Sequence, residues 1–258
     1  MKKNILFFTA LNANDPNIEA YKEYSLKTWN HYAKLHDLEV VILDTPLCDV
    51  EEMRPTWQRW YVYDILESNN IEYDRVALID IDTMVKWDCP NLFEIVPPDK
   101  LGGVKDDLSL EWINNSIEGY RRAFPQFEHT TLDWTEYMNN GVLILPNDGK
   151  KLAETIKTFY LSNQEKLREL QHKTLKKGTD QTPVNFITRN EMGHRIKFIP
   201  KSYNMTHLDK TYAFHSSMFR KYPIFIEYGY IWHYNGIPRE ARPGAMKQTW
   251  DLIKEHYE

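Results

Sequence analysis

Three short apolar runs, separated by stretches with helical periodicity, restrict the first part of this chain to an alternating α/β fold. The runs are residues 4–11 (NILFFTAL), 39–44 (EVVILD) and 75–85 (RVALIDIDTMV). Each is short and apolar, as expected for a strand that is covered on both faces of a sheet. Residues 18–36 and the stretch after Pro55 carry apolar side chains at helical spacing. This order of elements predicts a largely parallel sheet with right-handed crossovers.

The remainder of the chain continues with strands and helices in a looser order. Predicted strands cover residues 100–106, 140–146, 195–200 and 228–234, and predicted helices cover residues 148–172, 180–190 and 244–257. Asp15 and Pro16 predict the start of the first helix, since Asp is a good N-cap and Pro suits the first helical position. No repeat, low-complexity linker or charge block divides the sequence. We therefore expect one α/β domain over residues 1–258, with a Rossmann-like, mostly parallel twisted sheet flanked by helices.

Charge and cysteine content restrict the partners and the compartment. The 258 residues have a formal net charge of -5 and no basic tract with interleaved aromatics, which argues against nucleic acid. The apolar run at residues 5–11 is too short to span a membrane and lacks a cleavage site, so we expect no transmembrane segment. Two cysteines, Cys48 and Cys89, favour a reduced, cytoplasmic location. Residues 220–222 (RKY) could still contact a lipid-linked acceptor at a membrane surface.

Two carboxylates, Asp80 and Asp82, lie inside the third apolar run. Burying two unpaired carboxylates costs on the order of several kcal/mol, so a cationic partner is expected. Regular strand geometry would point them to opposite faces, and they can share a ligand only if the chain turns there. Oxygen ligands at this density suit Mg²⁺ or Mn²⁺ with open positions for phosphate oxygens. The alternative is an ordinary solvated turn.

Four segments, taken together and in order, resemble the motifs of a known enzyme family. They are RVALIDIDTMV (75–85), YMNNGVLIL (137–145), DQTPVNFI (180–187) and IWHYNGIPR (231–239). Their order and spacing are similar to those of GT-A glycosyltransferases, and look most like the retaining enzymes of glycosyltransferase family 8. The resemblance covers residues 4 to about 240. It implies a GT-A fold and transfer of a sugar from a nucleotide diphosphate sugar.

The resemblance also implies a set of metal ligands. Asp80 and Asp82 would bind a divalent metal, Mn²⁺ or Mg²⁺, that bridges the diphosphate of the donor. His233 matches the third metal ligand of the family. Its alternative role is that of a packed histidine between Trp232 and Tyr234.

A cation is expected beside the departing diphosphate. Gly236 and Arg239 complete an H-x-x-G-x-x-R pattern, in which the family usually has Lys at the last position. Either cation can neutralise a diphosphate, and Arg can do so with a bidentate fork. Arg242, three residues further on, is the competing candidate for this role.

The nucleotide is expected at the end of the first predicted strand. Thr9, Ala10 and Asn12 match the uridine site of the family, although the acidic residue often found after that strand is absent, which leaves a guanosine donor open. Arg59 matches an arginine that contacts the donor in relatives. A surface salt bridge is its alternative.

The donor sugar is expected beside three other segments of the resemblance. Asp106 matches a carboxylate that binds sugar hydroxyls, and Asn139 and Gly141 match a loop under the sugar. Asp180 and Gln181 match the family's DQ pair, with the acid on sugar hydroxyls and the Gln near the reacting face. The alternative for the pair is an ordinary helix start, where Asp is common.

The resemblance implies a metal-dependent glycosyltransferase, with a UDP-sugar as the favoured donor and a hydroxyl of a glycan or glycoconjugate as the acceptor. The DQ pair favours retention of configuration. An inverting enzyme would need a carboxylate base, for which Asp107, Glu111 and Glu191 are candidates.

Two alternatives come from other functional classes. A nucleotidyltransferase would typically open with a Gly-rich, basic phosphate loop, which this chain lacks. A non-catalytic carbohydrate-binding protein would explain the aromatic content of 14%. Within the predicted domain we expect residues 1–105 to form the nucleotide-binding half and residues 106–258 the acceptor-binding half. The aromatic, polar stretch 107–138 is expected to be partly helical but the least regular part of the chain, and is a candidate for the acceptor wall or lid.

Overall fold

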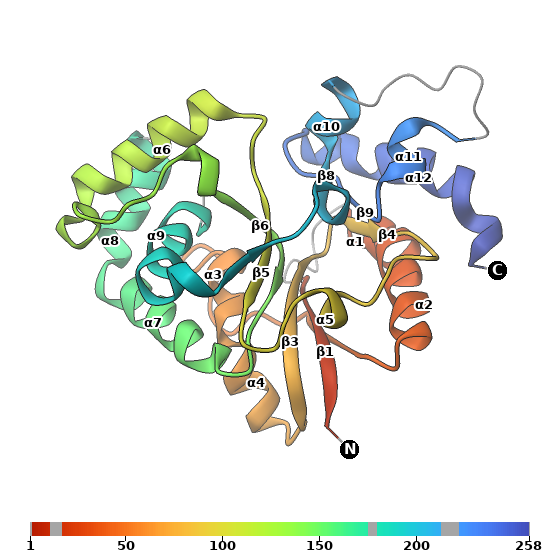
Figure 1. Cartoon of the computed structure of the whole chain (residues 1–258), viewed down its shortest axis with the longest axis horizontal. Helices are drawn as coiled ribbons and strands as arrows, with labels where there is room; N and C mark the ends of the chain where they lie inside the picture. The colour runs from red at the N-terminus through yellow and green to blue at the C-terminus, as the bar shows by residue number, and fades with distance from the viewer. Residues whose placement is uncertain (1, 11–16, 175–179, 213–221, 258) are drawn as a thin grey trace.

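A central six-stranded sheet organises the protein (Figure 1). The computed structural model describes residues 2–10, 17–174, 180–212 and 222–257. In the order β2-β1-β3-β6-β5-β7, the strands are Glu39–Leu43, Lys3–Thr9, Tyr73–Asp80, Met138–Ile144, Leu101–Lys105 and Ile196–Phe198. Strand β1 is parallel to β2 and β3, and β5 is parallel to β7, whereas β6 is antiparallel to both its neighbours. The prediction of a mostly parallel sheet is confirmed.

Helices cover both faces of this sheet, with α3, α4, α6, α7 and α9 on one side and α2 and α5 on the other (Figure 1). Along β1, Ile5 and Phe7 enter the first core, and Leu6 and Phe8 enter the second. Both faces of the strand are buried, as its continuous apolar sequence requires. The helices are α1 (Ile18–Ala20), α2 (Lys27–Leu35), α3 (Pro55–Gln58), α4 (Val62–Ser68), α5 (Leu92–Ile95), α6 (Leu110–Ala123), α7 (Gly149–Ser162), α8 (Gln164–Glu169) and α9 (Gln181–Met192).

A second, three-stranded sheet lies beside the carboxyl end of β3. Its order is β4 (Thr83–Val85), β9 (Ile231–His233) and β8 (Met205–Thr206). The sheet packs through Met84 and Trp232 onto helix α12 (Arg242–Ile253) and onto the π-helical turn η1 (Tyr21–Leu26). Helices α10 (His207–Tyr212) and α11 (Ile224–Tyr228) complete this part of the molecule (Figure 1). In the small sheet, β9 from the C-terminal segment pairs with β4, and the paired residues Val85 and Ile231 are about 150 positions apart in the sequence.

The structure corrects an expectation about the burial of residues 39–44. Strand β2 is an edge strand with partly exposed side chains, including Ile42 at 37%, because β1 is its one sheet neighbour. The stretch 107–138 is partly helical, as expected, and contains the 14-residue helix α6, which buries Ile113, Ile117 and Tyr120. The predicted helix start at residues 15–16 lies outside the described residues.

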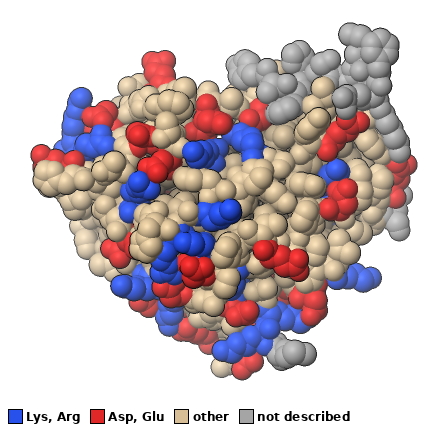
Figure 2. All heavy atoms as spheres, viewed as in Figure 1, with Lys and Arg blue, Asp and Glu red and all other residues tan. Residues whose placement is uncertain are grey.

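On the face drawn in Figure 2, basic and acidic side chains are interspersed. In the part of the chain that the structure describes, no helix combines the length and the apolarity needed to cross a membrane.

Candidate active site

Asp80 and Asp82 approach one point because the chain turns directly after β3. Asp80 ends β3 beside Thr9, the last residue of β1, at the carboxyl edge of the parallel strands. Ile81 and Asp82 form a turn, and Thr83 then starts β4 and donates its hydroxyl to the Asp80 carbonyl oxygen at 2.7 Å. The turn that a shared ligand requires is therefore present.

His233 joins the two acids through the pairing of β4 with β9. Thr83 pairs with His233 in the antiparallel register, and the Tyr234 N–H donates to the Asp82 carbonyl oxygen at 2.9 Å. His233 Nε2 lies 3.5 Å from a carboxylate oxygen of Asp80 and 3.3 Å from one of Asp82. One ligand atom from each of the three side chains lies within 4.8 Å of the other two.

A divalent cation fits this arrangement. Mg²⁺ binds its ligands at about 2.1 Å in octahedral geometry, which places neighbouring ligand atoms about 3.0 Å apart. The nitrogen–oxygen separations at this site, 3.3 and 3.5 Å, exceed that value by a few tenths of an ångström, so small side-chain shifts would bring the three ligand atoms onto one ion. His233 is 2% exposed, and its Nε2 faces the carboxylates of both Asp80 and Asp82. A nitrogen placed between two carboxylates can hold either a proton or a metal ion, and both would offset the negative charge there.

The protonation of the three side chains is coupled. Burial raises the pKa of Asp80, and Arg59 opposes this shift. Burial would also raise the pKa of Asp82, but His233 and Arg242 outweigh it, so this pKa is lowered. Burial disfavours a charged His233, yet the two carboxylates outweigh burial and raise its pKa. A metal ion at this point would take the place of the imidazole proton.

Arg59 connects two of the predicted carboxylates in a buried network. One guanidinium nitrogen donates to Asp80 at 2.9 Å and to the Asn140 carbonyl oxygen at 3.1 Å, and the other donates to Asp180 at 2.6 Å. The Trp60 indole also donates to Asp180, at 3.0 Å. Arg59 is 3% exposed and its pair with Asp180 is fully buried, so the alternative of a surface salt bridge for Arg59 is wrong. These two carboxylates and the carbonyl hold Arg59 in the wall of the site.

Asp106, Asn139 and Gln181 form a second polar group at the carboxyl end of β5. Asp106 accepts hydrogen bonds from the Asn139 amide at 3.3 Å and from the Gln181 amide at 3.1 Å. The Asn140 N–H donates to Gln181 Oε1 at 3.3 Å. The DQ pair is divided in this structure, because Gln181 belongs to this group whereas Asp180 is buried against Arg59.

Gly141 has a steric role beside His233. A Cβ atom at this position would lie 2.3 Å from His233 Cε1 and 2.6 Å from Nδ1. Both distances are shorter than real Cβ contacts, so the ring can occupy its place only because residue 141 is glycine. The group that lies close to the Gly141 backbone, as the sequence predicted for this glycine, is the imidazole of His233.

A pocket of about 600 Å³ opens beside the three candidate ligands. The predicted residues that line it are Thr9, Ala10, Arg59, Asp80, Asp82, His233 and Arg239, joined by the alternative Arg242. Asn12 lies outside the described residues. The pocket thus collects side chains from the ends of β1 and β3 and from the C-terminal segment.

The C-terminal segment presents two arginines to this pocket. Gly236 has a φ of +71°, so it is required by the backbone of the turn that follows β9. Arg239 starts the short helix η8 (Arg239–Ala241) and lines the pocket. Arg242 donates to Asp82 at 2.8 Å. Both candidates for the diphosphate cation are therefore near the site.

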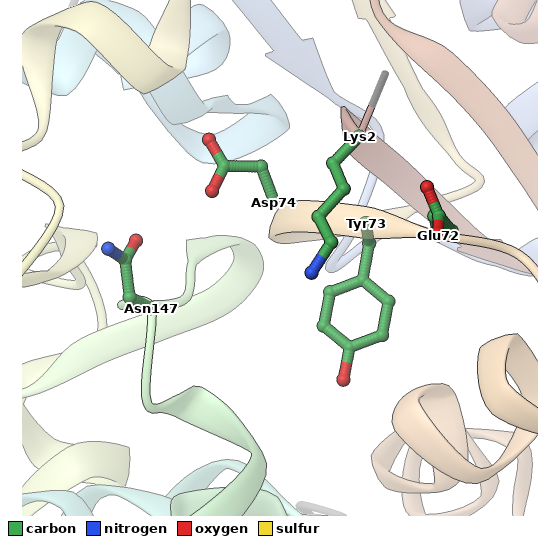
Figure 3. A pocket seen from close by; sticks show the side chains of 5 residues that line it. All are labelled: Lys2, Glu72, Tyr73, Asp74 and Asn147. Atoms are coloured by element: carbon green, nitrogen blue, oxygen red, sulfur yellow. The ribbon is translucent and has the colours of Figure 1, made fainter.

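A pocket of about 400 Å³ lies near the amino ends of β1 and β3, far along the sheet from Asp80 (Figure 3). Lys2, Tyr73, Asp74 and other polar residues line it, but their polar ends point in different directions (Figure 3). It lacks the convergence of charged groups found around His233.

Comparison with known proteins identifies the family. Residues 49–239 match the family described as glycosyl transferase family 8. The chain belongs to glycosyltransferase family 8. It is thus a nucleotide-sugar glycosyltransferase, and the resemblance drawn from the four segments is confirmed. No curated protein sequence matches the chain.

Solved structures share the fold of this family 8 protein. A glycosyltransferase involved in glycosylation of the major capsid of PBCV-1 is 11% identical, with a TM-score of 0.58 over 95% of this chain and 99% of that one. The bifunctional glycosyltransferase WbbM is 15% identical, with a TM-score of 0.51 over 99% of this chain and 51% of that one. An active-site mutant of LgtC is 14% identical, with a TM-score of 0.50 over 98% of this chain and 95% of that one. At these identities the likeness shows the fold alone, which is of the GT-A type.

Two further residues, Trp60 and Asn204, shape the site of this family 8 protein. Trp60 follows Arg59 directly and shares its partner Asp180, so its position beside a candidate residue was the available signal. Asn204 contacts both His233 and Asn139, and the N-x-T sequon that it opens in the sequence does not indicate either contact.

Proposed function

We propose that this chain transfers a glycosyl unit from a UDP-sugar to a hydroxyl of a glycan or glycoconjugate, with retention of configuration, and that Mn²⁺ or Mg²⁺ is its cofactor. The observation that carries the proposal is the convergence of Asp80, Asp82 and His233 at the edge of a pocket that two arginines also line. The pocket offers carboxylates for a metal and cations for a diphosphate in one place.

Each side chain has a task in this proposal. Asp80, Asp82 and His233 would hold the metal, which supplies positive charge to the diphosphate when bound. Arg239, with Arg242 as the alternative, would stabilise the negative charge that grows on the leaving diphosphate. Because that charge develops during bond breaking, these contacts would strengthen in the transition state.

The donor sugar is proposed to bind between the metal ligands and the polar group around Asp106. Asp106 and Gln181 would contact sugar hydroxyls and the reacting face, since their mutual hydrogen bond holds both polar ends together. Asp180 stays a predicted sugar ligand, although in this structure one of its oxygens accepts from both Arg59 and Trp60. Asn139 and Gly141 would support this part of the site from β6.

Retention is supported by where the candidate bases lie. Among the described residues, Asp107, Glu111 and Glu191 are exposed and none of them lines the pocket. Asp107 also pairs with Lys201 at 2.8 Å. An inverting enzyme would need one of these carboxylates beside the acceptor hydroxyl.

Single observations support the proposed uracil base of the donor, the proposed cytoplasmic location and the proposed division of the domain into two halves. Thr9 and Ala10 line the pocket at the end of β1, where a uracil edge would be read. Cys48 and Cys89 are unpaired, which suits a cytoplasmic protein. Pocket residues come from both the proposed nucleotide-binding half (1–105) and the proposed acceptor-binding half (106–258).

Thermal unfolding with UDP, GDP and CDP, each with and without Mn²⁺, tests the donor and the metal together. We expect UDP with Mn²⁺ to raise the midpoint most, because a ligand that binds only the folded state stabilises it. If GDP is the one nucleotide that stabilises the protein, the base of the donor is guanine and not uracil. If no nucleoside diphosphate stabilises the protein even with Mn²⁺, the proposed function is refuted.

Donor hydrolysis and transfer then separate the enzyme from a binding protein. UDP release from a panel of UDP-sugars identifies the sugar, and NMR of the anomeric proton of the product reports retention or inversion. Arg239→Ala and Arg242→Ala, measured side by side, identify which arginine acts on the leaving group. Replacement of that arginine should lower kcat by a larger factor than it raises KM.

A further inference from the structure

Asn204 is a fully buried polar residue between the two sheets. It ends the short helix η7 (Lys201–Asn204), directly before β8, and its exposed fraction is 0%. Its side-chain oxygen lies 2.9 Å from His233 Nδ1, on β9 of the small sheet. Its amide nitrogen donates to Asn139 Oδ1 at 2.8 Å, on β6 of the large sheet. One side chain therefore bridges a candidate metal ligand and a candidate donor-site residue.

The direction of these hydrogen bonds follows from a backbone group. The Gly141 N–H donates to Asn139 Oδ1 at 2.9 Å, and a backbone N–H can only donate. The group of Asn204 that faces the same oxygen must then be its NH₂. This leaves the oxygen of Asn204 toward His233, so Nδ1 of the imidazole carries a proton and donates it.

The same network reaches the reacting side of the pocket. Asn139 uses its oxygen for Gly141 and Asn204 and its NH₂ for Asp106, at 3.3 Å. Asp106 in turn accepts from Gln181 at 3.1 Å. A continuous series of hydrogen bonds therefore joins His233 to Gln181 through Asn204.

We infer that Asn204 is a positioning residue that fixes His233 with Nδ1 protonated, so that the lone pair of Nε2 is directed at a metal held by Asp80 and Asp82. The inference rests on the proposed metal site and deepens it. A ligating imidazole needs its metal-facing nitrogen free of a proton, and the hydrogen bond made by the other nitrogen sets which one that is.

A purely structural asparagine would have different partners. Asn185 is also buried, and it bonds backbone groups of Met138 and Gln181, as expected of a residue that satisfies the chain around it. The two hydrogen bonds of Asn204 instead go to His233 and Asn139, both of which are candidate site side chains. This choice of partners favours a role in the site.

Mn²⁺ affinity without substrate tests the inference. Electron paramagnetic resonance of free Mn²⁺ gives the dissociation constant of the wild type and of Asn204→Leu, which keeps the volume but loses both hydrogen bonds. We expect Mn²⁺ to bind about 10–100-fold more weakly in Asn204→Leu, the usual loss for a partner of a metal ligand. Asn204→Asp can still accept the proton of Nδ1, so it should restore part of the affinity.

Thr206→Val is the matched control. It removes a buried hydroxyl that donates to Asp209 at 2.7 Å, two residues from Asn204 and in the adjoining strand. We expect Thr206→Val to bind Mn²⁺ as the wild type does. Equal Mn²⁺ affinity in Asn204→Leu and the wild type would overturn the inference and leave the metal site intact. A wild type that binds no Mn²⁺, with or without UDP, would refute the metal site itself.

The tautomer of the wild type gives a second test that needs no folded Asn204 variant. Two-bond ¹H–¹⁵N spectra of the histidine-labelled, metal-free protein at alkaline pH show which nitrogen of His233 is protonated, with His233→Gln used to assign the signal. We expect the Nδ1–H form. An Nε2–H form would overturn the inference.

Discussion

Gly141→Ala is expected to disturb the metal site through one methyl group. The new Cβ would lie 2.3 Å from His233 Cε1, whereas ordinary contacts begin at 3.4 Å. The imidazole, or the β6 backbone beside it, must therefore move by at least about 0.7 Å to reach the shortest tolerated contact and by about 1.1 Å to reach an ordinary one. Metal–ligand distances tolerate only about 0.2 Å, so Nε2 could no longer share an ion with Asp80 and Asp82 in their present positions.

Two quantities should change in this variant. Inserting a methyl group into a packed site costs about 1–3 kcal/mol of unfolding free energy, which urea unfolding of the metal-free protein measures. Mn²⁺ affinity should fall at least about tenfold, because a ligand is displaced and its contact with Asn204 is strained. Electron paramagnetic resonance of free Mn²⁺ supplies this value.

Gly244→Ala is the control for Gly141→Ala. Nothing lies within 4 Å of a Cβ at Gly244, an exposed residue in the first turn of α12. Alanine there should leave Mn²⁺ affinity unchanged and stabilise the helix by up to about 1 kcal/mol. If Gly141→Ala binds Mn²⁺ as tightly as Gly244→Ala, the steric argument for His233 is refuted.

Three further outcomes follow from the charges of the site. Arg59→Met should lower the free energy of unfolding by about 3–5 kcal/mol in urea titrations, because it leaves Asp80 and Asp180 without their buried cation; an unchanged midpoint would contradict this. Asp82→Asn should abolish metal-dependent donor hydrolysis while circular dichroism stays native, and full activity would place the metal elsewhere. Mn²⁺ affinity should weaken as pH falls through the raised pKa of His233, since a proton competes for Nε2; a flat profile from pH 6 to 9 would exclude this competition.

The pH dependence of stability should have the opposite sign in the metal-free protein. The two carboxylates raise the pKa of His233 above its ordinary value of 6.5. The stability that its charge contributes is therefore full below pH 6.5 and is lost as pH rises through the raised pKa. Urea unfolding of the wild type and His233→Gln over this range isolates the contribution, which saturating Mn²⁺ should remove.

Local patterns in the sequence were sufficient to predict most of the helices and strands, and to predict at which edge of the sheet the site lies. The apolar runs of β1 and β3 could only be buried strands, and parallel strands place their carboxyl ends together. Asp80 was therefore predictable as a strand-end carboxylate, and the four segments added the family. The burial of strand β2 was misjudged, because the exposure of an edge strand depends on its neighbours rather than on its local pattern.

The partners of each site residue depended on contacts that no local pattern encodes. The pairing of β4 with β9 sets His233 across from Thr83, and it is the turn at Asp82 that lets both acids face it. Asp180 and Gln181 are adjacent in sequence, yet one is buried against Arg59 and the other bonds Asp106. Sequence determined which chemical groups are present, because composition and periodicity are properties of the chain. Tertiary structure decided which groups meet, because hydrogen bonds and packing act between atoms that the fold brings within a few ångströms.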